Sequence, residues 1–175
     1  MKIVAESFQP NQIKAYLDAH PYKSPFSRDL VVIHHTASPS LDGEEDGRPN
    51  GLTAQHIQNL KSYYESLGWS SGPHFFVDDH QIWAFTPVNE RGTHAKAFNK
   101  NGIGIEMLGD YDSEDPWSGR GLKVLENTRA LVKQLVSQYD LTANDIRFHR
   151  DDPQTSKTCP GTKINKQQFL DFLAQ

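Results

Sequence analysis

The chain has 175 residues, one of them a cysteine, a formal net charge of −4 and a sequence pI near 6.0. This length can bury the core of a single domain, 1–175, without the internal disulfides that a lone Cys159 excludes, and the acidic balance argues against a nucleic-acid partner. No apolar run is long enough to span a membrane and residues 1–7 turn polar too early for a signal peptide, so we expect a protein made in the cytosol without a membrane partner; we also expect a monomer.

The first elements in chain order are a helix and a buried strand. Residues 11–19 lie between two prolines and predict a short amphipathic helix. Residues 30–34 begin with four apolar residues and predict a central strand that ends at His34 and His35. Because adjacent strand residues point to opposite faces, only one of the two histidines can easily join a site, and spacing leaves open which one.

A loop, a helix and a hairpin are expected next. The acidic residues of 42–50 do not match the spacing of a calcium loop, so a solvated loop is favoured over a Ca²⁺ site. Thr53 as N-cap and Gly68 at the C′ position predict a helix that packs on the sheet. Its apolar positions on one face are Ile57, Leu60, Tyr64 and Leu67. Residues 74–77 and 82–85 flank a polar turn and predict a β-hairpin.

The strand predicted at 102–109 carries a carboxylate among apolar residues. Alternation places Gly104 and Glu106 on the same face. A buried charge is costly unless it is paired or near a metal, and Gly104 leaves room for another group to approach. Glu106 is therefore a candidate functional group; the alternative is an edge position with Glu106 in solvent.

The C-terminal part completes an α/β pattern. Residues 121–139 keep helical spacing of apolar positions that we assign to the core, 142–145 form a turn, 146–148 a short strand, and 165–174 a closing helix. The chain is therefore predicted to be a single α/β domain, with a mixed sheet and helices on both faces.

A loop at 148–161 joins His149 to Cys159 and reads as half of a zinc site. Imidazole and thiolate are good Zn²⁺ ligands, and a loop can bring both onto one ion. The chain has eight histidines, which mildly favours metal chemistry, and His34 or His35 could add a third ligand. The alternative is a buried, inert cysteine beside an unrelated histidine.

These motifs together resemble the zinc-dependent N-acetylmuramoyl-L-alanine amidases. This family includes phage T7-type lysozymes, cytosolic amidases of cell-wall recycling and peptidoglycan recognition proteins. The resemblance covers about residues 28–173 and keeps the order of the motifs. They are Val32–Ala37, Gly72–Val77, His94 with Asn99, Ile103–Glu106, and His149 through Lys157–Gly161.

The resemblance implies which residues act. His34, rather than His35, would bind one zinc ion with His149 and Cys159, while Glu106 and Lys157 would act on the substrate. His94 and Asn99 would lie beside the cleft and contact substrate, although a structural role for His94 is equally plausible. Pro73 stands where other branches often carry a catalytic tyrosine, which makes Glu106 the better candidate for the base.

The implied reaction is cleavage of the amide between the lactyl group of N-acetylmuramic acid and L-alanine of the stem peptide. Peptidoglycan or a muropeptide would be the partner, and a phage-derived enzyme would reach the wall only after release. Two alternatives remain. One is a non-catalytic peptidoglycan-binding module, against which Cys159, Glu106 and Lys157 argue; the other is a structural zinc protein, for which His35 is a poor fourth ligand.

Overall fold

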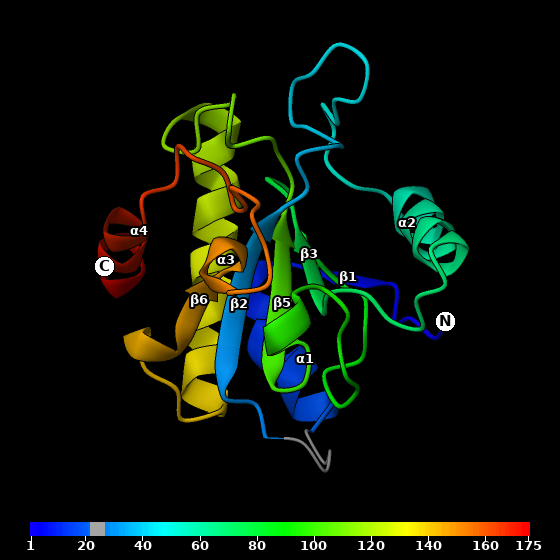
Figure 1. The fold of residues 1–175 in the computed structure, drawn as a ribbon, viewed down its shortest axis with the longest axis vertical. Coiled ribbons are helices and arrows are strands. Elements are labelled where there is room, and N and C mark those ends of the chain that lie inside the picture. Colours follow the sequence, from blue (N-terminus) through cyan, green and yellow to red (C-terminus); the bar gives the residue numbers. More distant parts are fainter. Residues whose placement is uncertain (22–26) are drawn as a thin grey trace.

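The computed structural model describes residues 1–21 and 27–175, which form a six-stranded mixed sheet flanked by helices (Figure 1). The strand order is β1-β4-β3-β5-β2-β6. The strands are β1 (Glu6–Phe8), β2 (Leu30–His35), β3 (Phe75–Val77), β4 (Ile82–Ala84), β5 (Gly102–Met107) and β6 (Ile146–Phe148). Strands β3, β5, β2 and β6 are parallel, and β4 and β1 add antiparallel neighbours at one side.

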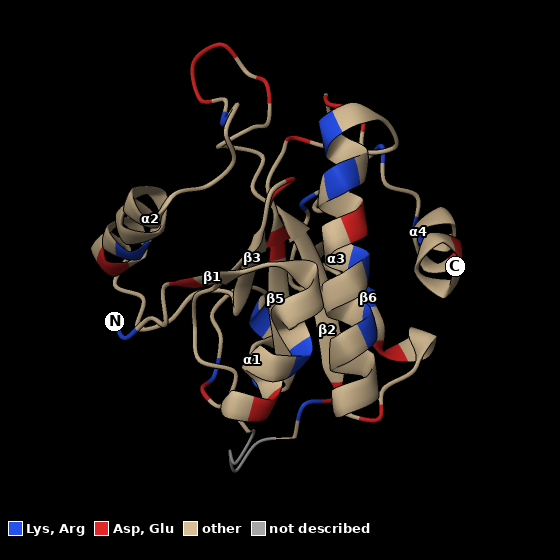
Figure 2. Ribbon diagram, turned by 180° about the vertical axis from the view of Figure 1, so that it is seen from behind, with Lys and Arg blue, Asp and Glu red and all other residues tan. Residues whose placement is uncertain are grey.

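The predicted α/β architecture, a mixed sheet with flanking helices, is confirmed. The helices are α1 (Ile13–Ala19), α2 (Ala54–Ser66), α3 (Gly119–Gln138) and α4 (Lys166–Ala174), with single 3₁₀ turns at Pro10–Gln12, Lys96–Phe98, Ala143–Asp145 and His149–Asp151. Viewed from behind, α1 and α3 lie across one face (Figure 2). Helix α2 stands on the other side, away from the strands (Figure 1).

The main core lies between the sheet and α3. The inner side of α3 buries the stripe expected of a core helix, with Val124, Leu125, Leu131 and Leu135 fully buried. Opposite them, Ile33 of β2 and the alternate residues of β5 are also fully buried. Each such side chain contributes about 1.5–3 kcal/mol relative to an exposed one, so this layer holds the central strands firmly in place.

Two elements differ from the sequence expectation. Strand β1 is not predicted, because Glu6 and Ser7 are exposed and carry no apolar alternation; its pairing with β4 creates it. The prediction that α2 packs its apolar face on the sheet is only partly right. Ile57 is fully buried, but Leu67 is 47% exposed, because α2 stands at the rim of a cleft.

Among the described residues, no helix combines the length and apolar character needed to cross a bilayer.

Candidate functional site

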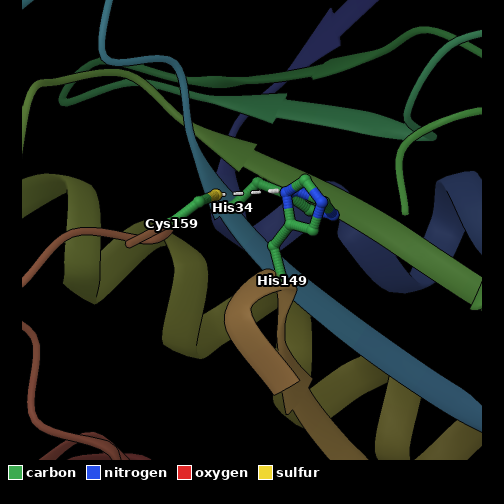
Figure 3. A group of neighbouring side chains, drawn as sticks. All are labelled: His34, His149 and Cys159. Carbon is green, nitrogen blue, oxygen red and sulfur yellow. Dashed lines mark hydrogen bonds between the residues drawn. The ribbon is translucent and has the colours of Figure 1, made fainter. Parts of the chain in front are cut away.

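Three side chains from distant parts of the sequence meet at one end of the sheet. His34 lies near the end of β2, His149 directly follows β6, and Cys159 comes from the loop beyond it. Their potential ligand atoms all lie within 4.8 Å of one another. The Nδ1 atoms of the two histidines are 3.1 Å apart, and Cys159 Sγ is 3.7 Å from His34 Nδ1 (Figure 3).

The sheet itself explains why the two histidines meet. Strands β2 and β6 are parallel neighbours, and Ile33 pairs with Phe148. The next residue of each chain segment therefore leaves the same edge of the sheet, where parallel α/β sheets place their sites. The two histidines can therefore lie side by side although they are far apart in the sequence.

His35 is directed elsewhere. Its Nδ1 accepts a hydrogen bond from the backbone N–H of Tyr111 at 3.1 Å, and its own backbone N–H donates to Cys159 Sγ at 3.4 Å. The residue is 8% exposed, and its ring stacks on Tyr111. The structure thus brings His34, and not His35, to His149 and Cys159, the arrangement that the resemblance implies.

Burial sets the charge of the three groups. It lowers the pKa of His34 well below its usual range, and burial followed by the charge of Lys157 lowers the pKa of His149. Both imidazoles are therefore neutral at pH 7 and have a lone pair for a metal. Burial raises the pKa of the Cys159 thiol, so a nearby cation is needed to favour the thiolate. Two neutral imidazoles and one thiol around a common point fit a zinc ion with an open fourth position.

Glu106 lies next to this group. In the register of β2 and β5 it pairs with His34, and its Oε1 is 3.8 Å from His34 Nδ1. Its side chain is 15% exposed, and burial raises its pKa to about 8, against the opposing effect of Lys157. The alternative of an edge position in solvent is wrong, since β5 lies between β3 and β2.

A cleft of about 810 Å³ opens over these residues. Lys157 and Glu106 line it together with the metal-ligand candidates. Lys157 is exposed, so its ammonium group can reach a ligand in the cleft. Neutral metal-ligand candidates, a carboxyl group and an exposed ammonium group therefore face one open volume.

Three aromatic residues and one leucine form the α2 side of the cleft, which we call the aromatic wall: Tyr63, Tyr64, Leu67 and Trp69. Tyr63 is 57% and Trp69 37% exposed, while Tyr64 stacks on Trp69 at 5.2 Å. Sequence periodicity placed Tyr64 and Leu67 on the face that packs on the sheet, because a helix that borders a cleft and a helix that packs on a sheet have the same apolar spacing. The sequence signal for this cleft wall was the presence of two further aromatic residues, Tyr63 and Trp69, outside the apolar face of the helix.

The structure places the two predicted substrate contacts, His94 and Asn99, differently. His94 lines the cleft but is only 9% exposed, and its Nδ1 is 3.1 Å from Nε2 of His34. Burial lowers its pKa to about 4, so the ring is neutral. Asn99 Oδ1 accepts the backbone N–H groups of His94 and Ala95, each at 2.8 Å, and Asn99 is not among the lining residues. In this structure Asn99 holds the His94 turn in shape.

Because the side chains of His34 and His35 point in different directions, we expect their substitution to have different effects. We expect His34→Ala to abolish metal binding, because it removes a donor atom. His35→Ala should leave metal content close to wild type and lower the free energy of unfolding by about 1–3 kcal/mol, since the N–H of Tyr111 loses its acceptor. Metal analysis and chemical denaturation measure both effects. Loss of metal in the His35 variant alone would contradict this assignment.

Comparison with known proteins agrees with the geometry. The family profile described as N-acetylmuramoyl-L-alanine amidase matches residues 24–162. The chain is 28% identical over 134 residues to the N-acetylmuramoyl-L-alanine amidase XlyA of Bacillus subtilis, covering 74% of this chain but only 38% of that protein. It is 30% identical over 139 residues to peptidoglycan-recognition protein SC1a of Drosophila melanogaster, covering 77% of this chain and 68% of the relative.

A solved structure shares the fold. It is the N-acetylmuramoyl-L-alanine amidase LysC from Clostridium intestinale, which is 26% identical and superposes with a TM-score of 0.66 over 88% of this chain and 90% of the other. The family profile covers more than half of the residues, and its matched range contains His34, Glu106, His149 and Cys159. The chain therefore belongs to the N-acetylmuramoyl-L-alanine amidase family.

Proposed function

We propose that this protein is a zinc-dependent hydrolase of the amide between the lactyl group of N-acetylmuramic acid and L-alanine of the peptidoglycan stem peptide. The observation that carries the proposal is the meeting of three metal-ligand candidates with a buried carboxylate in one cleft. A binding protein has no need of a carboxylate 3.8 Å from a ligand atom. A hydrolase needs such a group to move a proton.

His34, His149 and Cys159 would hold the ion. Bound there, a zinc ion supplies a Lewis acid that lowers the pKa of a water toward ~7 and polarises an amide carbonyl. The donor set matches this use, because three protein ligands leave a fourth position open to the cleft.

Glu106 is the proposed proton carrier. With a pKa of about 8, Glu106 is largely protonated at pH 7 in the metal-free protein. The positive charges of a bound zinc ion and of Lys157 would favour its carboxylate, which lies beside His34 and would take a proton from the attacking water. The same group would then pass that proton to the nitrogen of the departing L-alanine. Pro73 provides no hydroxyl at the position where relatives often carry a tyrosine, which leaves the proton transfer to Glu106.

Lys157 is the proposed partner of the developing oxyanion. It lines the cleft, and its charge lowers the pKa of Glu106 and of His149, so it lies close enough to act on charge at the site. An ammonium group that faces the carbonyl oxygen stabilises negative charge that arises only along the reaction path.

The aromatic wall is evidence for a ligand that contains sugar rings. Its exposed faces offer flat apolar surface, while the metal-ligand candidates, Glu106 and Lys157 are polar groups of the same cleft. A glycopeptide matches this division, since sugar rings have apolar faces and the amide must reach the metal group.

Product analysis tests the proposal directly. The protein loaded with zinc is incubated with purified peptidoglycan and, separately, with a soluble muropeptide, and the products are identified by mass spectrometry. Hydrolysis should release peptides with a free N-terminal L-alanine and leave a lactyl carboxylate on the glycan, without new reducing ends. Tight binding of peptidoglycan by the zinc-loaded protein without any cleavage product would identify a non-catalytic recognition module instead.

Removal of the ammonium group should affect the chemical step more than binding. We expect Lys157→Ala to keep zinc and lower kcat about 10²–10³-fold, with a smaller rise in KM, because the oxyanion is absent in the ground state. Lys163→Ala, which removes a lysine outside the cleft-lining set, is the matched control. Equal losses in kcat for the two variants would argue that Lys157 acts only through the general charge of the protein.

A further inference from the structure

We infer that His94 is a positioning residue that fixes the tautomer and orientation of His34, so that Nδ1 of His34 is the metal-binding atom. This inference rests on the proposed zinc site and assigns His94 a place behind the ligand. Of the two roles that the sequence left open for His94, substrate contact and a structural role, it takes up the structural one.

The carbonyl oxygen of Gly102 determines the direction of the hydrogen bonds that link it to His94 and His94 to His34. His94 Nε2 lies 3.3 Å from the carbonyl oxygen of Gly102, and a carbonyl only accepts, so Nε2 carries the proton. In a neutral imidazole the other nitrogen is then an acceptor. His94 Nδ1 therefore accepts from His34 Nε2, 3.1 Å away.

This tautomer of His34 leaves one of its ring nitrogens free to bind the metal. When His34 carries its proton on Nε2, its Nδ1 has a free lone pair. That atom lies 3.1 Å from His149 Nδ1 and 3.7 Å from Cys159 Sγ, on the side where the three donors meet (Figure 3). In the opposite tautomer the proton of His34 would lie on Nδ1, between the three metal-ligand candidates. His94 would then donate from Nδ1 to His34, and its unprotonated Nε2 would face the carbonyl oxygen of Gly102, so that two acceptors would oppose each other.

Two glycines make the space that His94 occupies. A Cβ at Gly104 would lie 2.5 Å from Cγ of His94, and one at Gly92 would lie 2.9 Å from its Cδ2. Gly104 is on the same face of β5 as Glu106, and the group that approaches it is the His94 ring. Asn99 fixes the backbone of the same turn. The ring is thus held from three sides against His34, at right angles to it with centroids 5.1 Å apart.

Three substitutions at this position separate hydrogen bonding from packing. His94→Leu fills the space without an acceptor, His94→Ala leaves the space empty, and His94→Asn keeps an acceptor at the position of Nδ1. We expect the zinc dissociation constant, measured by competition with a chelator, to rise about 10–100-fold for Leu and Ala and to stay within about 5-fold of wild type for Asn. If only packing matters, Leu will retain zinc and Asn will lose it, which would overturn the inference.

A second measurement needs neither zinc nor activity. Long-range ¹⁵N–¹H correlation spectra of the metal-free wild-type protein report which ring nitrogen of His34 is protonated. We expect Nε2–H for His34 and for His94; an Nδ1–H tautomer of His34 would refute the inference. A protein that shows the expected tautomers and zinc affinities but cleaves no peptidoglycan would disprove the proposed function and leave the role of His94 intact.

Discussion

The Glu106→Gln protein is expected to bind zinc and fold normally, yet to lose about 10²–10⁴-fold in kcat, the usual share of general acid–base catalysis. The amide is nearly isosteric with the carboxylate, and Glu106 is not one of the three ligand candidates. Gln cannot take a proton from water or carry it to the leaving nitrogen. Release of stem peptides from peptidoglycan, followed with metal analysis of the same preparation, measures both quantities.

The control for this variant is Glu126→Gln, which removes one exposed carboxylate from α3, the helix on the opposite face of the sheet. Its turnover should equal that of the wild type. Near wild-type turnover of a zinc-loaded Glu106→Gln protein would show that Glu106 has a structural role, and the proton transfer would have to be assigned elsewhere.

Loss of the thiol should have the second large effect. We expect Cys159→Ser to lose most of its zinc and, with it, the activity, because a hydroxyl is a much poorer zinc ligand than a thiolate. Zinc bound only to the native state stabilises the fold by about 2.7 kcal/mol at a free concentration of 100 times the dissociation constant. Addition of zinc should therefore raise the melting temperature of the wild type and leave that of the variant unchanged.

Thr158→Ala provides a neighbouring comparison. Thr158 belongs to the same loop and its hydroxyl donates a hydrogen bond to Asp112 at 2.7 Å, and it is not one of the three ligand candidates. It should retain zinc and the zinc-dependent rise in melting temperature. Stoichiometric zinc in the Cys159→Ser protein would remove Cys159 from the site.

Local sequence patterns were sufficient for the elements that carry the site. The apolar run before His34 predicted β2, and the alternation around Glu106 predicted β5, because the central strands of a covered sheet are buried and read as continuous or alternating apolar residues. The caps of α2 marked both of its ends to within about two residues, since Thr53 accepts the N–H of His56 as a capping residue does.

Tertiary structure decided the questions that depend on which segments are neighbours in space. Spacing could not choose between His34 and His35, because that choice depends on β2 lying beside β6, whose register places His149 next to His34. Spacing also predicted that α2 packs on the sheet, because it gives the apolar face of a helix but not what lies opposite that face. The sequence by itself thus determined the chemical groups and the central strands, through local periodicity and residue type. Only the folded chain decided which nitrogen of which histidine faces the thiol, because the ring of His34 is oriented by His94, a partner distant in sequence.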